Sequence, residues 1–239
     1  KTTDPKVKVM LLCNPHNPAG RVWTREELTR IGEICIRNGV MVVADEIHCE
    51  LILPDYVYTP FASISDEFLI HSITCLSPSK AFNIAGLQIA NIVCADDVVR
   101  AKIDRAINDN EVCDVNPFGV IATQAAYNDS EEWLEQLLDY LNQNYLYMRD
   151  FCKTYLPGFP ITILEGTYLV WVDFSGYGFS NEELEHLMLE EAKLWLDSGI
   201  IFGPETAQFE RFNVACPRVT VKQALTQLKD ALDKHLAKK

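Results

Sequence analysis

The stretch "VKVMLLCNPHNPAGRVWTREELTRIGEICIRNGVMVVAD", residues 7–45, decides the fold of this chain. Its apolar segments at 7–13 and 40–44 predict two buried strands, and residues 24–39 between them have the apolar periodicity of a helix. A strand, a helix and a strand joined by short loops form a βαβ unit, which is right-handed and has parallel strands. We therefore expect an α/β fold in which ligands bind beyond the carboxyl ends of the strands.

Both ends of the predicted helix carry specific signals. Thr24 and Glu27 form a capping-box pattern at its start, and Asn38-Gly39 ends it. The loop before the helix, "NPHNPAGR" at 14–21, is punctuated by Pro and Gly. Because Asp45 directly follows the second strand, we expect this loop and Asp45 to lie at the same edge of the sheet, where the cost of burying the acid requires a partner.

The remaining chain divides into three parts. We expect domains at 1–127 and 157–239, joined by a bridging helix at 128–156. The first domain continues with strands at 68–74 and 88–94 and with helices that begin near Asp96 and Asn116. The second is expected to be a small α+β domain with strands within 161–174, a helix at 181–198, strands at 200–202 and 211–216, and a last helix from Thr220 to Leu236.

The composition argues against several kinds of partner. With 21 Lys and Arg against 34 Asp and Glu, the net charge of −13 repels phosphate backbones and anionic lipid, so we expect neither nucleic acid nor membrane as a partner. The eight cysteines form no CxxC pair, and His residues are not clustered. We therefore expect a cytoplasmic protein with reduced thiols and no metal site.

The stretch "SPSKAFNIAGLQ", residues 77–88, places Lys80 among small and apolar residues between two predicted strands. A lysine is a nucleophile only when deprotonated, and burial or nearby positive charge lowers a lysine pKa. The alternative is a surface lysine in a loop. The other motifs of the chain favour the catalytic interpretation.

Four motifs occur in order: "NPHNPAG" at 14–20, "ADEIH" at 44–48, "SPSKAFNIAGL" at 77–87 and "RFNVACPR" at 211–218. Together they resemble the fold-type I enzymes that use pyridoxal 5'-phosphate (PLP). Within the class I/II aminotransferase superfamily, the chain is most similar to the MalY/PatB-like cystathionine β-lyase branch. The resemblance implies a PLP-transferase fold, with part of a large α/β domain that has a mainly parallel sheet, and a smaller α+β C-terminal domain.

The resemblance also implies roles for residues around the cofactor. Lys80 would form the Schiff base and move protons at the α- and β-carbons of the substrate. Asp45 would pair with the pyridine nitrogen, and Asn17 and His48 would contact the phenolic oxygen. Ser77 and Ser79 would offer hydroxyls to the phosphate. The ordinary alternatives are a turn cap for Asp45, turn chemistry for Asn17 and a structural role for His48.

By the resemblance, Arg218 matches the arginine that binds the substrate α-carboxylate. The planar fork of an arginine suits bidentate binding of a carboxylate. The alternative is a surface salt bridge. Arg211 is expected to be structural, and Tyr168 to pack near the site. Gln88 stands where many aminotransferases have a phosphate-binding arginine, which favours the lyase branch. The loop 203–210 is less glycine-rich than is typical of the family.

In the family, a phosphate-binding glycine loop, a stacking aromatic residue and residues donated across a dimer interface precede the first strand. We therefore expect this chain to be the C-terminal part of a homodimeric enzyme and to have weak or no activity alone. The expected reaction is β-elimination from cystathionine or a cysteine S-conjugate. An aminotransferase on the same cofactor and a non-catalytic or regulatory interaction module are the alternatives.

Overall fold

The computed structural model describes residues 4, 6–156 and 161–237, and the chain separates into two compact units. Unit 1 comprises Lys1–His16 and Arg21–Leu137, and unit 2 comprises Asn17–Gly20 and Leu138–Lys239. The expected start of a second domain at residue 157 lies outside the described residues. In the described part of the chain, no helix has the length and apolar character needed to cross a membrane.

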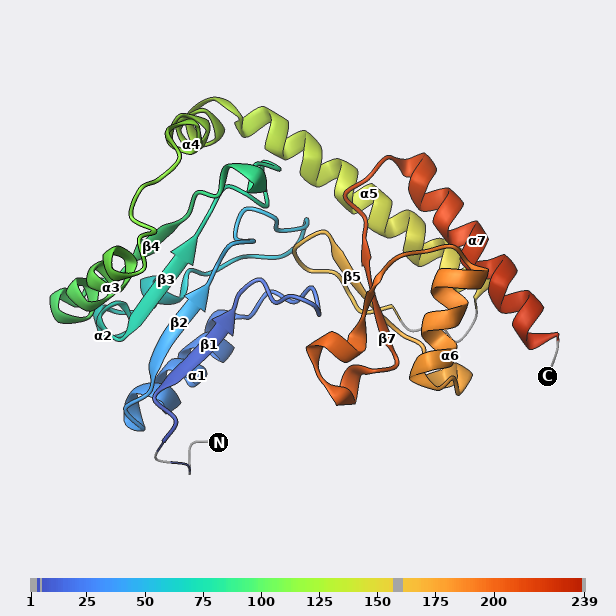
Figure 1. Cartoon of the computed structure of the whole chain (residues 1–239), viewed down its shortest axis with the longest axis horizontal. Helices are drawn as coiled ribbons and strands as arrows, with labels where there is room; N and C mark the ends of the chain where they lie inside the picture. Colours follow the sequence, from blue (N-terminus) through green and yellow to red (C-terminus); the bar gives the residue numbers. More distant parts are fainter. Residues whose placement is uncertain (1–3, 5, 157–160, 238–239) are drawn as a thin grey trace. The chain divides into compact units, whose positions relative to one another are not determined.

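Unit 1 is built on a four-stranded sheet in the order β1-β2-β3-β4 (Figure 1). The strands β1, β2 and β3 are parallel, and β4 pairs with β3 in antiparallel fashion. This confirms the expected α/β fold with a mainly parallel sheet. The strands are β1 (Val9–Cys13), β2 (Met41–Asp45), β3 (Ser72–Leu76) and β4 (Asn91–Val93).

One face of this sheet carries the hydrophobic core of the unit. Helix α1 (Arg25–Arg37) and the short α2 (Asp66–Ile70) contribute Leu28, Cys35 and Phe68 to a cluster with alternate residues of the strands, among them Leu12 and Ala44. Residues that alternate with these point to the other face. There Leu11 is 79% exposed, so β1 is buried on one face only, in contrast to the fully buried strand expected from its apolar run.

The third strand begins later than the sequence predicts. Residues Asp66–Ile70, where the apolar run begins, form α2, whose N-cap Ser65 accepts a hydrogen bond from the Phe68 amide. The strand follows at Ser72–Leu76. A local cap therefore outweighed the β propensity of a short apolar run.

The helices of unit 1 begin at the expected caps. The capping box of Thr24 and Glu27 opens α1, Asp96 caps α3 (Asp97–Asp109) and Asn116 caps α4 (Pro117–Asp129). Helix α5 (Glu131–Tyr155) follows, and the division between the units falls within it, after Leu137.

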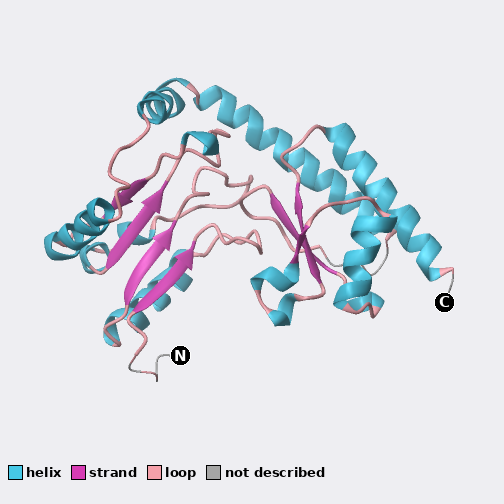
Figure 2. Ribbon diagram, viewed as in Figure 1, coloured by secondary structure: helices cyan, strands magenta, loops and turns pink. Residues whose placement is uncertain are grey.

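Unit 2 contains the rest of α5 and an antiparallel sheet in the order β5-β7-β6. In Figure 2 the helices are cyan and the strands magenta. Leu225, Leu228 and Leu232 of the last helix are among its most deeply buried side chains. Its other elements are β5 (Leu169–Asp173), α6 (Asn181–His186), β6 (Asp197–Ser198), β7 (Phe209–Asn213) and α7 (Arg218–Leu236).

Several expectations for unit 2 were wrong in detail. Within residues 161–174 only Leu169–Asp173 form a strand, β5, and Ile161 contributes an isolated bridge to Val172 instead of a hairpin partner strand. The helix capped by Ser180 changes to a π-helix at Leu187–Glu191 and ends there, because Lys193 has a left-handed φ of 56°. The predicted strand at 200–202 is a 3₁₀ turn, and the last helix begins at Arg218 instead of Thr220.

Candidate functional site

The carboxyl ends of the parallel strands in unit 1 meet at one edge of the sheet. Asp45 lies in register with Cys13 on one side and with Cys75 on the other. Its side chain belongs to the face opposite the core and is exposed, and Oδ1 accepts a hydrogen bond from the Ile47 amide at 3.3 Å. The acid therefore needs no internal partner to offset burial, contrary to our expectation, and its carboxylate is accessible.

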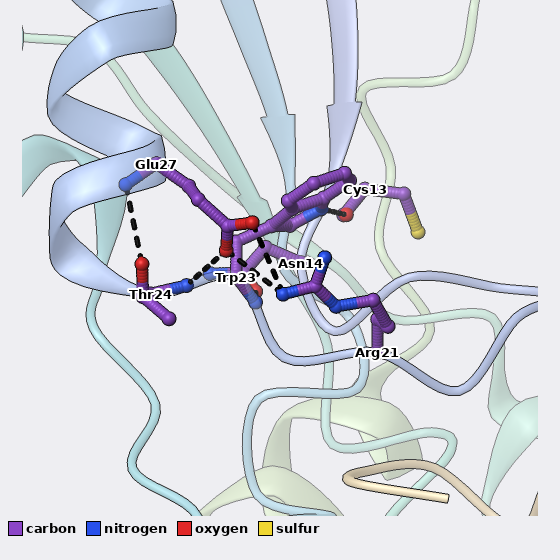
Figure 3. Close-up of polar contacts among 6 residues, drawn as sticks. All are labelled: Cys13, Asn14, Arg21, Trp23, Thr24 and Glu27. Atoms are coloured by element: carbon purple, nitrogen blue, oxygen red, sulfur yellow. Dashed lines mark hydrogen bonds and ion pairs between the residues drawn. The ribbon is translucent and has the colours of Figure 1, made fainter. Parts of the chain in front are cut away.

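Asn14 holds the loop that follows β1, and it is fully buried. Its backbone amide donates to the Asp45 carbonyl at 3.0 Å. Its side-chain oxygen accepts from the Trp23 backbone amide at 3.1 Å, and both of these residues are drawn in Figure 3. The side-chain nitrogen donates to the Thr59 carbonyl at 3.2 Å. These bonds connect the loop to the end of β2 and to a distant segment.

The far end of the same loop is fixed by Trp23 and Arg21 (Figure 3). The Trp23 indole donates to the Cys13 carbonyl at 3.0 Å, and Arg21 forms an ion pair with Glu27 at 2.9 Å. The Glu27 carboxylate also accepts from the Thr24 amide in the capping box. Helix α1 and the loop are thus held to each other at the sheet edge.

The segment after Asp45 is fixed by a buried acid. Glu46 is 1% exposed, and its carboxylate accepts from the Tyr58 hydroxyl and from the Phe61 amide. Burial raises the pKa of Glu46, although both hydrogen bonds oppose the shift. His48 follows in the next turn and is also buried, at 3% exposed.

Lys80 lies in the turn that follows β3. It is half-buried, and its side chain makes no hydrogen bond or ion pair with any residue described in the structure. The turn is held by Ser77, whose hydroxyl donates to the Ile89 carbonyl at 2.6 Å and accepts from the Ser79 amide at 3.1 Å. Gln88 is exposed and has a left-handed φ of 51°.

In unit 2, Asn17 contacts Arg211 and not Arg218. The Nη1 of Arg211 donates to Oδ1 of Asn17 at 2.7 Å. Its Nη2 donates to Asp197 at 2.5 Å, and the guanidinium lies 5.1 Å from the centre of the Phe202 ring. The Arg211 side chain is 16% exposed. A mostly buried cation is thus fixed beside a residue of the "NPHNPAG" motif.

Arg218 is held elsewhere and serves as an anchor for the start of α7. Its Nε donates to the buried Oδ1 of Asn144, its backbone amide donates to the Tyr140 hydroxyl, and its guanidinium lies over the Tyr147 ring. Asn144 in turn donates to the carbonyls of Val214 and Cys216. This guanidinium therefore connects α5 to α7, and the role of Arg218 in substrate binding stays a prediction.

Tyr168 is half-buried close to Arg211. Burial raises its pKa, and the positive charge of Arg211 opposes that shift. The backbone carbonyl of Tyr168 accepts from the Val214 amide, beyond the end of β7. The expectation that Tyr168 packs near the site stays a prediction.

Glu210 precedes Arg211 on β7 and is 2% exposed. Burial, with added repulsion from Glu185 and Asp197, raises the pKa of Glu210 to about 7. Between pH 4.5 and 7 the folded state therefore binds more protons at this carboxyl than the unfolded state does. The stability of the folded state falls as pH rises through this window, and the loss is complete above pH 7.

We expect Glu210→Gln to stabilise the protein at pH 8 by roughly 1–3 kcal/mol and to have little effect at pH 4.5. The neutral amide removes the cost of an ionised buried carboxylate. Urea unfolding measured across this pH range tests the expectation, with Glu205→Gln as an exposed control. Equal changes for both variants at every pH would contradict it.

Comparison with known proteins identifies the family of this chain. The family model "Aminotransferase class I and II" matches residues 1–228. The chain belongs to the aminotransferase class I and II family. The family motifs at 14–20, 44–48 and 77–87 correspond to the loop after β1, the end of β2 and the turn after β3.

Individual members of the aminotransferase class I and II family match nearly all of the chain. Cystathionine β-lyase PatB of Bacillus subtilis (strain 168) is 43% identical over 232 residues, which cover 97% of this chain and 60% of PatB. Cystalysin of Treponema denticola, whose crystal structure contains PLP, has a TM-score of 0.92 at 33% identity, covering 98% of this chain and 59% of cystalysin. The PLP-bound C–S lyase of Staphylococcus hominis has a TM-score of 0.86 at 36% identity, over 96% and 59% of the two chains. The chain therefore spans about 60% of the length of these relatives.

Sequence reasoning did not single out Asn14 or Asp197, and it expected Arg211 to be structural. Arg211 and Arg218 stand at opposite ends of one motif, so the motif did not distinguish them. One available signal was that Arg211 lies within a predicted strand, where a buried charge needs a partner. Asp197 had no comparable signal, because it lay in a predicted helix that the structure replaces by β6.

Proposed function

We propose that the protein carrying this sequence is a PLP-dependent carbon–sulfur β-lyase acting on cystathionine or a cysteine S-conjugate. The similarity to cystathionine β-lyase PatB over 97% of the chain carries this proposal. The structural likeness to cystalysin and to the C–S lyase of Staphylococcus hominis supports it. We further propose that the protein is a cytoplasmic homodimer that binds neither nucleic acid nor membranes.

The side chains of unit 1 fit PLP as the cofactor. The Asp45 carboxylate is accessible at the sheet edge and suits a protonated pyridine nitrogen, and the Lys80 amine has no competing ion pair among the described residues. The Ser77 hydrogen is engaged with the Ile89 carbonyl, so we assign Ser77 to shaping the turn and Ser79 to phosphate binding. His48 and Asn17 are proposed to lie near the phenolic oxygen. When bound, PLP supplies an electron sink for negative charge at the substrate α-carbon.

We assign binding of the substrate α-carboxylate to Arg211. Its guanidinium is planar, mostly buried and fixed by Asn17, whereas Arg218 is committed to Asn144. A charged, bidentate contact to a carboxylate is among the stronger hydrogen-bonded pairs in proteins. This proposal differs from the expectation drawn from the sequence, which gave that role to Arg218.

Lys80 is proposed to move the proton in the elimination. Its Nζ removes the proton from the substrate α-carbon, and the electron pair left there forms a double bond to the β-carbon. The C–S bond breaks and the thiolate departs with the bonding pair, taking up one proton. The 2-aminoacrylate that remains gains a proton at its β-carbon and loses one from its nitrogen to become an imine. Hydrolysis of that imine consumes one water and yields pyruvate and ammonia.

The protein supplied with PLP and L-cystathionine tests this proposal. We expect stoichiometric release of pyruvate, ammonia and a free thiol without an added keto acid. An aminotransferase would instead need a keto acid and would return an amino acid derived from it. Turnover that depends on a keto acid and releases no thiol would overturn the lyase assignment.

A further inference from the structure

Asp197 forms an ion pair with Arg211, the residue whose guanidinium we assign to binding of the substrate carboxylate. It faces Arg211 directly across the β6–β7 pair, where the two residues are register partners. Its Oδ2 accepts from Nη2 of Arg211 at 2.5 Å. The protein thus presents a carboxylate of its own to the group proposed to bind a carboxylate.

The two partners of Arg211 are held differently. Asn17 lies in a loop whose neighbour Gly20 accepts hydrogen bonds from the Glu165 and Gly166 amides. Asp197 is 51% exposed, and within the described part of the chain its side chain makes no hydrogen bond except the one to Arg211. A side chain held by one contact can rotate into solvent while the guanidinium stays in place.

Arg211 also has unused donor capacity. Its Nε is buried and has no hydrogen-bond partner among the residues that the structure describes. A guanidinium has five N–H donors, and Nε together with one Nη forms a fork that matches a carboxylate. Release of Asp197 would free Nη2 beside Nε, so that both could bind the same carboxylate.

We propose that Asp197 is an internal competitor that covers Arg211 until a substrate carboxylate displaces it. The inference rests on the proposed role of Arg211 in the β-lyase reaction. Because the Asp197 carboxylate is half-exposed to water, its ion pair with Arg211 contributes little, and a ligand that gains two hydrogen bonds can replace it. Only molecules in which Asp197 has released Arg211 can bind a ligand carboxylate. The apparent affinity is therefore the intrinsic affinity multiplied by the fraction of molecules in that state.

The consequence is a specificity filter for carboxylate ligands. A ligand that reaches Arg211 with a single oxygen gains no more binding free energy than Asp197 already provides, and such a ligand is excluded. Ligands that present a carboxylate in the plane of the fork gain a second hydrogen bond and enter. Removing Asp197 should therefore improve binding of simple carboxylates, which is the opposite of what loss of a supporting residue would do.

Titration calorimetry of the PLP-loaded protein with 3-(methylthio)propionate tests the proposal without turnover, because this ligand has a carboxylate and a thioether but no amine. We expect Asp197→Asn to lower its Kd by roughly 3- to 10-fold. Asp233→Asn is the matched control, because Asp233 is similarly exposed and forms an ion pair with Lys229 of α7 at 2.6 Å. We expect it to leave Kd unchanged.

Each remaining outcome has a definite meaning. An unchanged or higher Kd for Asp197→Asn, with the control at the wild-type value, would overturn the competitor role and leave the role of Arg211 intact. If Arg211→Lys binds the ligand as tightly as the wild type, the assignment of Arg211 to the carboxylate fails, and the competitor role fails with it. Pyruvate release from L-cystathionine, measured separately, decides the β-lyase function independently of both.

Discussion

Replacing Lys80 by alanine is expected to lower the rate of β-elimination by roughly 10²–10⁴-fold. In the proposed reaction no other residue supplies an amine that removes the α-proton. The Lys80 side chain makes no bond that stabilises the described structure, so the variant should unfold at the same temperature as the wild type. Steady-state pyruvate release and thermal unfolding measure the two effects.

A second measurement connects the lysine to the cofactor. Borohydride reduction in the presence of PLP should fix the cofactor to the peptide that contains Lys80, and mass mapping identifies that peptide. Lys80→Arg, which keeps the positive charge but has no reactive amine, should remain unlabelled, and Lys102→Ala in the exposed part of α3 should label normally. A label that persists in Lys80→Arg would contradict the assignment.

Replacing Arg211 by lysine is expected to lower kcat/KM by roughly 30- to 1000-fold. The lysine keeps the charge but loses the planar fork, and hydrogen bonds to charged groups contribute about 1.5–3 kcal/mol each. The loss should appear mainly in KM if the carboxylate contact forms equally in the bound substrate and in the transition state. Steady-state kinetics with L-cystathionine separates these terms.

Arg218→Lys is the matched control for this prediction. It should change kcat/KM by less than about threefold and lower the free energy of unfolding by about 1–3 kcal/mol, because the buried Asn144 oxygen loses its donor. The reverse pattern, with a large kinetic loss for Arg218→Lys and none for Arg211→Lys, would restore the role that the sequence motif predicted.

Local signals in the sequence predicted the starts of several helices well. The capping boxes at Thr24 and Ser180 and the caps at Asp96 and Asn116 were all confirmed, because each depends on residues within one helical turn. The expected mainly parallel sheet was also confirmed. The βαβ pattern allowed few other topologies for these strands.

The sequence was less informative where contacts are distant along the chain. It predicted a helix at 181–198, but pairing with β7 makes Asp197 part of a strand. It also predicted a strand at 200–202, where the chain forms a 3₁₀ turn. In both places the outcome depends on packing within unit 2, which local propensity does not describe.

The sequence by itself determined the family, the α/β class of unit 1 and the positions of Lys80 and Asp45 in the chain, because motifs and short-range periodicity encode them. Only the tertiary structure decided which partners each arginine has. The sequence favoured Arg218 for the substrate and a structural role for Arg211, and in the fold Arg211 contacts Asn17 and Asp197 while Arg218 contacts Asn144. The reason is physical: a guanidinium is committed by the partners that the fold brings to it, and these partners lie 14 to 194 residues away in the chain.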